Sequence, residues 1–556
     1  MSATTYLRRL AGYPAMAAFI AGVLVAGLAF RLTTHKVTTA TVAAAPTTGT
    51  TAGAPAGTSD ASGFLGGTSA PAPGAAGATA TSAAAAAGGG VVSAPGTTVG
   101  PTTITGPGAT TPTGPAGVTP TQGVTPTKAA SALPASDVGV TATTIKLGIA
   151  LQDCSQCKAT FGTTGGWGPD QDKVVWDAWV AYVNKNGGIY GRKIVPDYQV
   201  VDVTNASTAQ AACTTWTETD HVFAIIGRDD MQSAGDVCVA VQHHTLEISG
   251  PQPKDPASIY RQANGMLISM GANGDRAMVA WAKALQHYGQ LKGHKPGIIV
   301  EQPLQPLAQE ALIPALKQLG YDVAYTAVVS NDPSQGPTQA AAQVAQFRTH
   351  GVDYVFALTN FINMAAFVNE ADKLQYKPKY TVNDSVGGEV SFFYTPFPDS
   401  WTGTSLITYT TPQTPAQPTF AQCLTKHNQI TGHHTSVPSG ALNPADEAAN
   451  NDAQEYSLAM EACTDLNMLT AAGKVAGANL TRARLSAAIQ GLGRSIVLGQ
   501  GNNNGGSFGP GKTDWEDGVR MEIFAPGDGS NNNCTPGSNS RCFNLAGPPY
   551  DPETNP

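Results

Sequence analysis

Short apolar runs alternate with longer amphipathic stretches over residues 144–384, and this alternation is the strongest pattern in the chain. The clearest run is Val222-Phe-Ala-Ile-Ile-Gly227, which polar residues flank on both sides. Such a run is typical of a strand buried on both faces of a parallel sheet. Strands that alternate with helices predict an α/β fold with right-handed crossovers. We therefore expect strands at 145–150, 194–203, 222–227, 246–249, 297–300, 323–329, 354–357 and 380–382, and helices at 172–185, 205–216, 234–243, 275–288, 307–319, 338–350, 362–374 and 446–469.

The N-terminus departs from this pattern. Arg8 and Arg9 precede an uncharged run at 10–30, which is long enough to cross a bilayer as a helix, and the arginines favour a cytoplasmic N-terminus. A cleaved signal peptide is the alternative, although its best cleavage site, Ala43-Ala-Ala45, lies well beyond the apolar run. We predict a membrane anchor or signal segment at 1–36. The rest of the chain is then extracytoplasmic, either tethered to the membrane or secreted after cleavage.

Residues 37–140 consist mainly of Ala, Thr, Gly, Pro and Ser. This composition cannot bury enough apolar surface to offset the entropy of ordering the chain, which predicts a disordered tether. The net charge of −8 argues against a nucleic-acid partner, because such proteins present a basic face.

The eight cysteines all lie beyond residue 150, and an even number fits a disulfide framework in an exported protein. Cys154 and Cys157 match a redox spacing, but a small structural disulfide is the favoured interpretation, and no second ligand pair for zinc lies nearby. Cys213 and Cys238 fall on consecutive predicted helices. The remaining natural pairs are Cys423 with Cys463, and Cys534 with Cys542 in a C-terminal tail at 526–556.

Several residues with reactive side chains receive no catalytic or metal role. The neighbours in His243-His244 and in His433-His434 point to different faces of a helix, so each pair offers at most one ligand to a common site. We expect surface histidines and no metal site. Ser233 and Ser249 lack the Gly-x-Ser-x-Gly elbow of a nucleophile. We therefore predict no enzyme and no cofactor.

One stretch carries a family resemblance. It comprises, in order, Gly187-Gly-Ile-Tyr-Gly-Arg-Lys-Ile194, Asp202, the run at 220–227 and Ile248-Ser249. Together these segments resemble the type I periplasmic binding proteins. The branch that it resembles most comprises the leucine/isoleucine/valine-binding proteins of ABC importers. The resemblance implies two Rossmann-like lobes that close on a small molecule. It assigns 141–265 plus about 385–505 to lobe 1, and 266–384 plus about 506–525 to lobe 2.

The resemblance also implies where a ligand binds. The ligand loops of that family fall here after the strands of both lobes, with Asp384 implied to take an ammonium group through charge-assisted hydrogen bonds. Phe161, in a glycine-rich loop with Trp167, is a further candidate from its position. The expected ligand residues are Phe161, Gln232, Ser233, Ser249, Gln252, Gln302, Asn360, Phe361 and Asp384.

Two loops depart from the family pattern. Arg228-Asp-Asp230 stands where relatives carry small residues and hydroxyls, and Glu301-Gln-Pro-Leu-Gln-Pro306 replaces a tyrosine-glycine pair. Both changes argue for a ligand other than a branched-chain amino acid.

The sequence therefore predicts an extracytoplasmic solute-binding protein. It would bind a small polar ligand, an amino acid or a related amide or organic acid, by hinge closure and deliver it to the permease of an ABC importer. The alternative is an extracellular ligand sensor of the same fold that is not coupled to transport. A secreted enzyme is the weakest of the three hypotheses, because the sequence shows no set of residues in a catalytic pattern.

Overall fold

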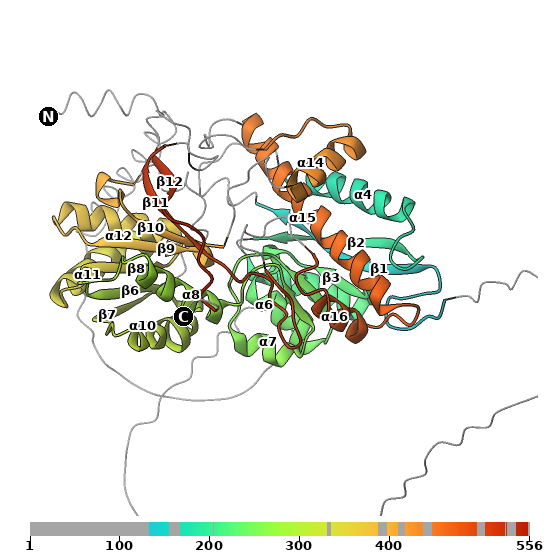
Figure 1. Ribbon diagram of the computed structural model, residues 1–556, viewed down its shortest axis with the longest axis horizontal. Coiled ribbons are helices and arrows are strands. Elements are labelled where there is room, and N and C mark those ends of the chain that lie inside the picture. Colours follow the sequence, from blue (N-terminus) through green and yellow to red (C-terminus); the bar gives the residue numbers. More distant parts are fainter. Residues whose placement is uncertain are drawn as a thin grey trace, which may run out of the picture. The chain divides into compact units, whose positions relative to one another are not determined.

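The computed structural model describes residues 133–154, 167–203, 205–330, 335–386, 397–409, 418–437, 447–496, 506–528, 530 and 541–553 (Figure 1). The chain separates into two units, Met1–Thr119 and Pro120–Pro556, and every described residue belongs to the second. The predicted anchor at 10–30, almost all of the tether, Phe161, Cys157 and Cys534 lie outside the described residues. Within those residues, no helix combines the length and the apolar character needed to cross a membrane.

The first sheet has five parallel strands in the order β2-β1-β3-β4-β5. The predicted strand at 222–227 forms its centre, β3. The strands are β1 (Thr144–Asp153), β2 (Lys193–Asp202), β3 (Ala224–Ile226), β4 (Leu246–Ser249) and β5 (Leu267–Ser269). The helices that follow them are α4 (Pro169–Lys185), α5 (Ala206–Thr214), α6 (Gln232–Asp236) and α7 (Ala257–Ala263), and the later helices of this part are α14 (Pro418–Thr431), α15 (Glu447–Ala476) and α16 (Arg482–Gln490).

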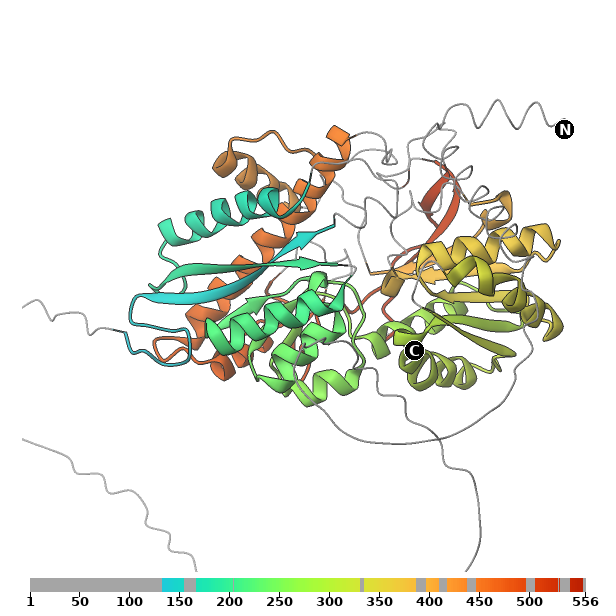
Figure 2. The same cartoon turned by 180° about the vertical axis from the view of Figure 1, so that it is seen from behind.

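Alternate residues of these strands serve opposite faces of the sheet, as the pleat requires. Leu147 and Ile149 of β1 belong to the apolar cluster that α4 and α15 complete. Ala150 and Ile225 belong to the cluster that α5 completes. Figure 1 shows α4 beside α15, and Figure 2 shows the same helices from behind. The sheet is therefore covered on both faces, which explains the continuous apolar run of β3.

The second sheet has seven strands in the order β12-β11-β10-β9-β8-β6-β7. Its strands from β6 to β10 are parallel, whereas β11 and β12 add an antiparallel edge. The strands are β6 (Pro296–Glu301), β7 (Tyr325–Val329), β8 (Tyr354–Leu358), β9 (Lys379–Asn383), β10 (Ser405–Thr408), β11 (Arg520–Pro526) and β12 (Arg541–Leu545). The helices α8 (Gly274–His287), α9 (Gln305–Leu307) and α10 (Ile313–Gln318) pack on one face, and α11 (Gly336–Thr349) and α12 (Phe361–Lys373) on the other.

The α/β class and the parallel pairing are thus as predicted, but the pattern missed several elements. It gave no signal for β5, which has only three residues, or for α7, α14, α16 and β10 to β12. The single helix expected at 234–243 is instead α6 followed by a π-helical turn at Val237–Gln242. The predicted lobe boundaries stay a prediction.

The glycine-rich segment that carries the family resemblance has a structural role. It forms the turn between α4 and β2, where a Cβ on Gly188 (φ +63°) would lie 2.0 Å from the carbonyl oxygen of Arg192. The Arg192 side chain is fully buried and donates to the backbone oxygens of Thr141, Pro134 and Ala478. The motif therefore anchors the turn to the start of β1 and to the end of α15.

Two of the predicted disulfides form among the described residues. Cys213 is joined to Cys238, and Cys423 on α14 is joined to Cys463 on α15. Cys154 and Cys542 are also disulfide-bonded. Asn205 caps α5, since its side chain accepts a hydrogen bond from the Ser207 amide.

Candidate functional site

The loop after β3 holds a buried ionic cluster around Arg228. The guanidinium contacts Asp172 and Asp230 through Nη1, at 3.0 Å each, and Glu461 through Nε at 2.7 Å. Asp172 belongs to α4 and Glu461 to α15, so a single side chain links this loop to two helices. We call Arg228, Asp172, Asp230 and Glu461 the Arg228 cluster.

The backbone of this loop is strained. Arg228 and Gln232 have φ values of +57° and +52°, a region that side-chain-bearing residues seldom adopt. Burial, partly offset by Arg228, raises the pKa of Asp230 to about 7. Strain and shifted pKa values concentrate at functional sites, although structural ion pairs produce them too. Here the partners are all internal, which points to a structural role for Arg228.

A second ionic cluster lies after β4. Lys254 contacts Asp236, donates to Ser249 Oγ at 2.8 Å and lies 3.3 Å from Asp255. The Ser233 hydroxyl hydrogen-bonds Asp255. Two of the predicted ligand residues, Ser233 and Ser249, are therefore engaged within the protein. We call Lys254, Asp236 and Asp255 the Lys254 cluster.

The loop after β4 also meets the turn after β9, which belongs to the other sheet. Gln252 Nε2 donates to the backbone oxygen of Ser385 at 3.3 Å, and Ser385 Oγ donates to the backbone oxygen of Pro253 at 2.9 Å. The carboxyl ends of the two parallel sheets thus come together at this point. In open α/β sheets, the carboxyl ends of the strands are where ligands bind.

Three carboxylates from three separate segments gather at this junction: Asp229 after β3, Asp384 after β9, and Glu516 before β11. Burial raises the pKa of Glu516, and the charges of Asp384 and Asp229 raise it further. Asp384 is 6% exposed and accepts a hydrogen bond from the Tyr409 amide at 2.6 Å. Glu516 is 2% exposed, and neither of its carboxylate oxygens has a hydrogen-bond partner among the described residues. We call Asp229, Asp384 and Glu516 the junction carboxylates.

The junction carboxylates have cations of the chain nearby. Burial raises the pKa of Asp229, and the charges of Lys254 and Arg228 oppose that rise. Arg276 of α8 acts on Glu516, but it is also bound to Asp514, to Asp517 at 3.0 Å and to Glu553 at 2.7 Å. Burial, followed by the charge of Asp384, raises the pKa of Glu516 well above its ordinary value. Glu516 therefore keeps its proton to a higher pH than an exposed glutamate does.

The predicted ligand residues in the loops of the second sheet differ in what they contact. Glu301, at the end of β6, accepts hydrogen bonds from the Thr359 hydroxyl at 3.1 Å and from both the amide and the side chain of Asn360. The Asn360 oxygen also caps α12. Gln302 is exposed, and Phe361 is half-buried against the second sheet. Asn360 therefore has a structural task, whereas Gln302 faces solvent.

Two predicted ligand residues next to the first sheet also make hydrogen bonds within the protein. Gln232 donates to the Val203 backbone oxygen at 2.8 Å, and the Gln252 amide donates to Asp229 at 3.0 Å. The tryptophans Trp176, Trp179 and Trp216 are core residues. Among the predicted ligand residues that the structure describes, Gln252 and Asp384 lie at the junction.

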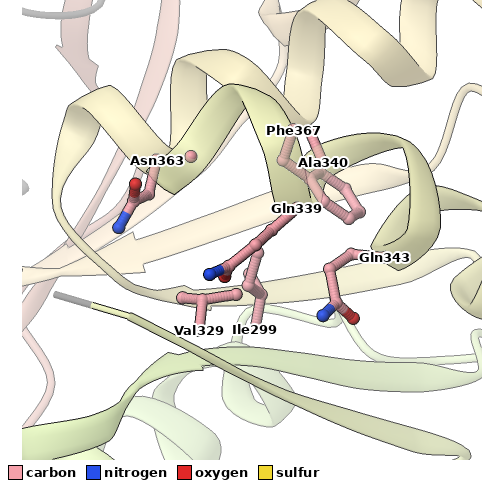
Figure 3. A pocket seen from close by; sticks show the side chains of 8 residues that line it. Ile299, Val329, Gln339, Ala340, Gln343, Asn363 and Phe367 are labelled. Carbon is pink, nitrogen blue, oxygen red and sulfur yellow. The ribbon is translucent and has the colours of Figure 1, made fainter. Parts of the chain in front are cut away.

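A small cavity in the second sheet is separate from this junction. Figure 3 shows its lining residues, which come from β6, β7, α11 and α12: Ile299, Val329, Gly336, Gln339, Ala340, Gln343, Asn363 and Phe367. A volume of about 10 Å³ is open to the centre of a water molecule, which is close to the smallest space that holds one water. It is too small for an amino acid.

Sequence reasoning missed Glu516, Arg276 and Tyr409. Glu516 lies in Asp514-Trp-Glu-Asp517, an acidic run beside a tryptophan in a glycine-rich stretch. Exposed acids are the common outcome in such a stretch, so the run gave no distinct signal. The one available hint was the apolar Trp515 within it, which is 2% exposed and holds the segment in the core.

Comparisons with known proteins agree with this architecture. A periplasmic binding protein family model matches residues 144–521. The chain is similar to a type 1 periplasmic binding protein from Bordetella pertussis Tohama I, with 16% identity, a TM-score of 0.51, and coverage of 71% of this chain and 100% of that one. It is also similar to an extracellular ligand-binding receptor from Rhodopseudomonas palustris HaA2, with 15% identity, a TM-score of 0.50, and coverage of 73% and 100%. No curated protein sequence matches the chain.

A third similar structure is a fatty acid ABC transporter substrate-binding protein from Thermomonospora curvata, with 18% identity, a TM-score of 0.49, and coverage of 73% of this chain and 94% of that one. At these identities the structures establish the fold alone. The family match spans well over half of the chain, and it confirms the resemblance predicted from the sequence. The chain belongs to the type I periplasmic binding proteins, a family of extracytoplasmic solute-binding proteins.

Proposed function

We propose that the protein binds a small polar ligand, an amino acid or a related amide or organic acid, and delivers it to an ABC permease. The anchor predicted at 10–30 and the tether at 37–140 would hold the binding unit outside the cell membrane. Closure of two lobes about a hinge would enclose the ligand. Family membership supports the solute-binding role.

The observation that carries the proposal is the set of junction carboxylates. They come from loops of both sheets, so a molecule that contacts Asp229, Asp384 and Glu516 together would favour the closed arrangement. A buried carboxylate binds an ammonium group through short, charge-assisted hydrogen bonds. Within the proposed range, these carboxylates support ligands that carry an amine, with Asp384 as its acceptor.

A thermal-shift screen of the full chain against amino acids, amides and small organic acids tests the proposal. We expect an amine-bearing compound to raise the melting temperature, because a ligand that binds only the folded state stabilises it. The Asp384→Asn variant keeps an oxygen for the Tyr409 amide but loses the charge. We expect this variant to lose the shift, with at least about a tenfold weaker affinity, equivalent to roughly 1.4 kcal/mol.

Asp399→Asn is the matched control, because its carboxylate is fully exposed and lies outside the junction. If no compound in the screen raises the melting temperature, solute binding of this kind is excluded. If a compound binds Asp384→Asn as tightly as it binds the unaltered protein, the role of Asp384 is wrong while solute binding stands.

A further inference from the structure

Three metal-ligating side chains converge away from the junction, where α14 packs against α15. The ligand atoms of His427, His433 and Glu455 all lie within 4.8 Å of one another. His427 Nε2 is 2.8 Å from Glu455 Oε1, and His433 Nδ1 contacts the same oxygen. His427 belongs to α14, Glu455 to α15, and His433 to the segment that leaves α14.

We propose that His427, His433 and Glu455 form a binding site for a divalent transition metal, with Zn²⁺ as the best fit. Imidazole nitrogen and carboxylate oxygen are both zinc ligands, at about 2.0–2.2 Å from the metal. Two histidines and one glutamate leave one tetrahedral position for water. The hard cations Mg²⁺ and Ca²⁺ prefer sites built from oxygen alone, so two nitrogen donors favour zinc.

The scaffold holds these donors in place before a metal arrives. Asn428 on α14 makes two hydrogen bonds with the backbone of Thr435, at 2.9 and 3.0 Å. Ser436 is bound to Asp452 of α15 through both its amide, at 3.2 Å, and its hydroxyl, at 2.6 Å. The segment that carries His433 is therefore fixed to both helices. Fixed ligands lose little conformational entropy on binding, which favours a site over a chance cluster.

The disulfide between the two helices adds to this rigidity. Cys423 lies one helical turn before His427, so both side chains project from the same face of α14. The bond from Cys423 to Cys463 holds that face against α15. The spacing between His427 and Glu455 is thus set by a covalent link as well as by packing.

Burial and charge also suit a metal. His427 is fully buried, the Glu455 side chain is 14% exposed, and the His433 side chain is 45% exposed, which leaves an entry path past His433. The neighbouring Lys426 points elsewhere, to Gln429 and over the Tyr182 ring.

One feature limits the affinity. When His427 Nε2 ligates a metal, its proton moves to Nδ1, and that buried atom has no hydrogen-bond partner among the described residues. Loss of such an outer partner typically weakens metal binding by about 10- to 100-fold. We therefore expect a site weaker than a structural zinc site whose outer partners are complete.

A second cluster with similar spacing does not qualify. Cys213, Cys238 and His243 also bring ligand atoms within 4.8 Å of one another. The two sulfur atoms are joined in a disulfide, and zinc binds the thiolate form of cysteine. The cluster at His427 is the stronger candidate for this reason.

The test is a calorimetric titration of the full chain, purified without a histidine tag and dialysed against a chelator, with ZnCl₂ at pH 7.5. We expect one site per chain. His433→Gln removes the most exposed donor with the least risk to folding, and should weaken zinc binding at least about tenfold. His434→Gln is the matched control, because His434 is exposed and adjacent but outside the cluster.

X-ray absorption at the zinc edge gives an independent readout. The zinc complex should show nitrogen and oxygen neighbours at about 2.0 Å with imidazole scattering. The proposal is overturned if the protein binds no zinc, if His433→Gln binds zinc as tightly as the unaltered protein, or if the neighbours are sulfur. None of these outcomes bears on solute binding at the junction, so the two proposals fail separately.

Discussion

Two regions of buried charge lie close together in this protein, and they are balanced in different ways. In the Arg228 cluster, one guanidinium contacts three carboxylates directly. At the junction, Glu516 has no hydrogen-bond partner among the described residues, and Arg276 is already bound to other acids. Asp229 and Asp230 are neighbours in sequence, yet Asp230 belongs to the first region and Asp229 to the second.

The difference lies in how directly the buried carboxylates of each region meet a cation of the chain. Buried ions are tolerated when they are paired and hydrogen-bonded, and they are costly when they are not. The Arg228 cluster satisfies that condition inside the chain. At the junction, Glu516 does not, because neither of its carboxylate oxygens has a hydrogen-bond partner among the described residues. Arg228 therefore holds the loop after β3 to α4 and α15, and the ligand recognition proposed above depends on the junction.

The largest change in stability is expected from Arg228→Met. Methionine keeps much of the apolar length but leaves Asp172, Asp230 and Glu461 buried without a cation. Breaking a buried ion pair by removing one partner typically costs about 3–5 kcal/mol, so we expect a loss of that size in the free energy of unfolding at pH 7. Urea denaturation measures it, with the exposed Arg348→Met on α11 as the control. A change below about 1 kcal/mol would show that the cluster contributes little to stability.

Glu516→Gln should raise the free energy of unfolding at neutral pH, whereas Arg228→Met should lower it. Burial, followed by Asp384, raises the pKa of Glu516, so the folded state holds the proton more tightly than the unfolded state. The free energy of unfolding then falls as pH rises from the unfolded pKa of about 4.3 through the raised folded value, by about 1.4 kcal/mol for each unit of pKa shift. Glutamine does not ionise, so the variant does not lose stability in this way as pH rises. We expect the variant to be more stable at pH 7.5 by about 1–3 kcal/mol, with no difference near pH 4.

The affinity of Glu516→Gln for a ligand is a second measurement on the same variant. If Glu516 serves the ligand, the variant gains stability and loses affinity for the amine-bearing compound, a common trade-off at functional sites. Glu310→Gln, on the exposed side of the helix at Ala308–Leu312, should change neither quantity. A Glu516→Gln protein that is less stable at pH 7.5 would mean that the carboxylate has a favourable partner in the folded state.

Much of the fold was predictable from local pattern. The run at 222–227 is apolar throughout because β3 is covered on both faces, and that condition is visible in the sequence itself. The three residues of β5 gave no signal, because a strand so short has no period to detect. Strand β10 pairs with β11 across a long sequence separation, for example Ser405 with Ile523, and local pattern does not encode that pairing.

The site was less predictable, for a physical reason. The position of Arg228 was expected to depart from the family pattern, but its partner Glu461 lies 233 residues away, so the ion pair exists only once α15 packs against the first sheet. Asp384 was expected at the site from the resemblance, whereas Glu516 was not. Its importance depends on burial without a partner, a property of the folded arrangement alone.

The smallest effect is expected from an exposed pair on the same helix that supplies Asp172. Lys173 Nζ and Asp177 Oδ2 are 2.5 Å apart on α4, with both side chains 48% exposed, and the ammonium lies 4.9 Å from the centre of the Tyr198 ring. Exposed pairs of this kind contribute about 0–1 kcal/mol, and an exposed cation–π contact adds about 0.5–1 kcal/mol. We expect Lys173→Met to lower the free energy of unfolding by less than about 2 kcal/mol, and added salt to reduce the difference further because solvent ions screen exposed charges. Parallel urea denaturation of Lys173→Met and Arg228→Met, at low and high salt, measures both effects in one series. Equal losses for the two variants would contradict the distinction between buried and exposed charge, since Asp172 and Lys173 are adjacent on one helix and differ mainly in their access to water.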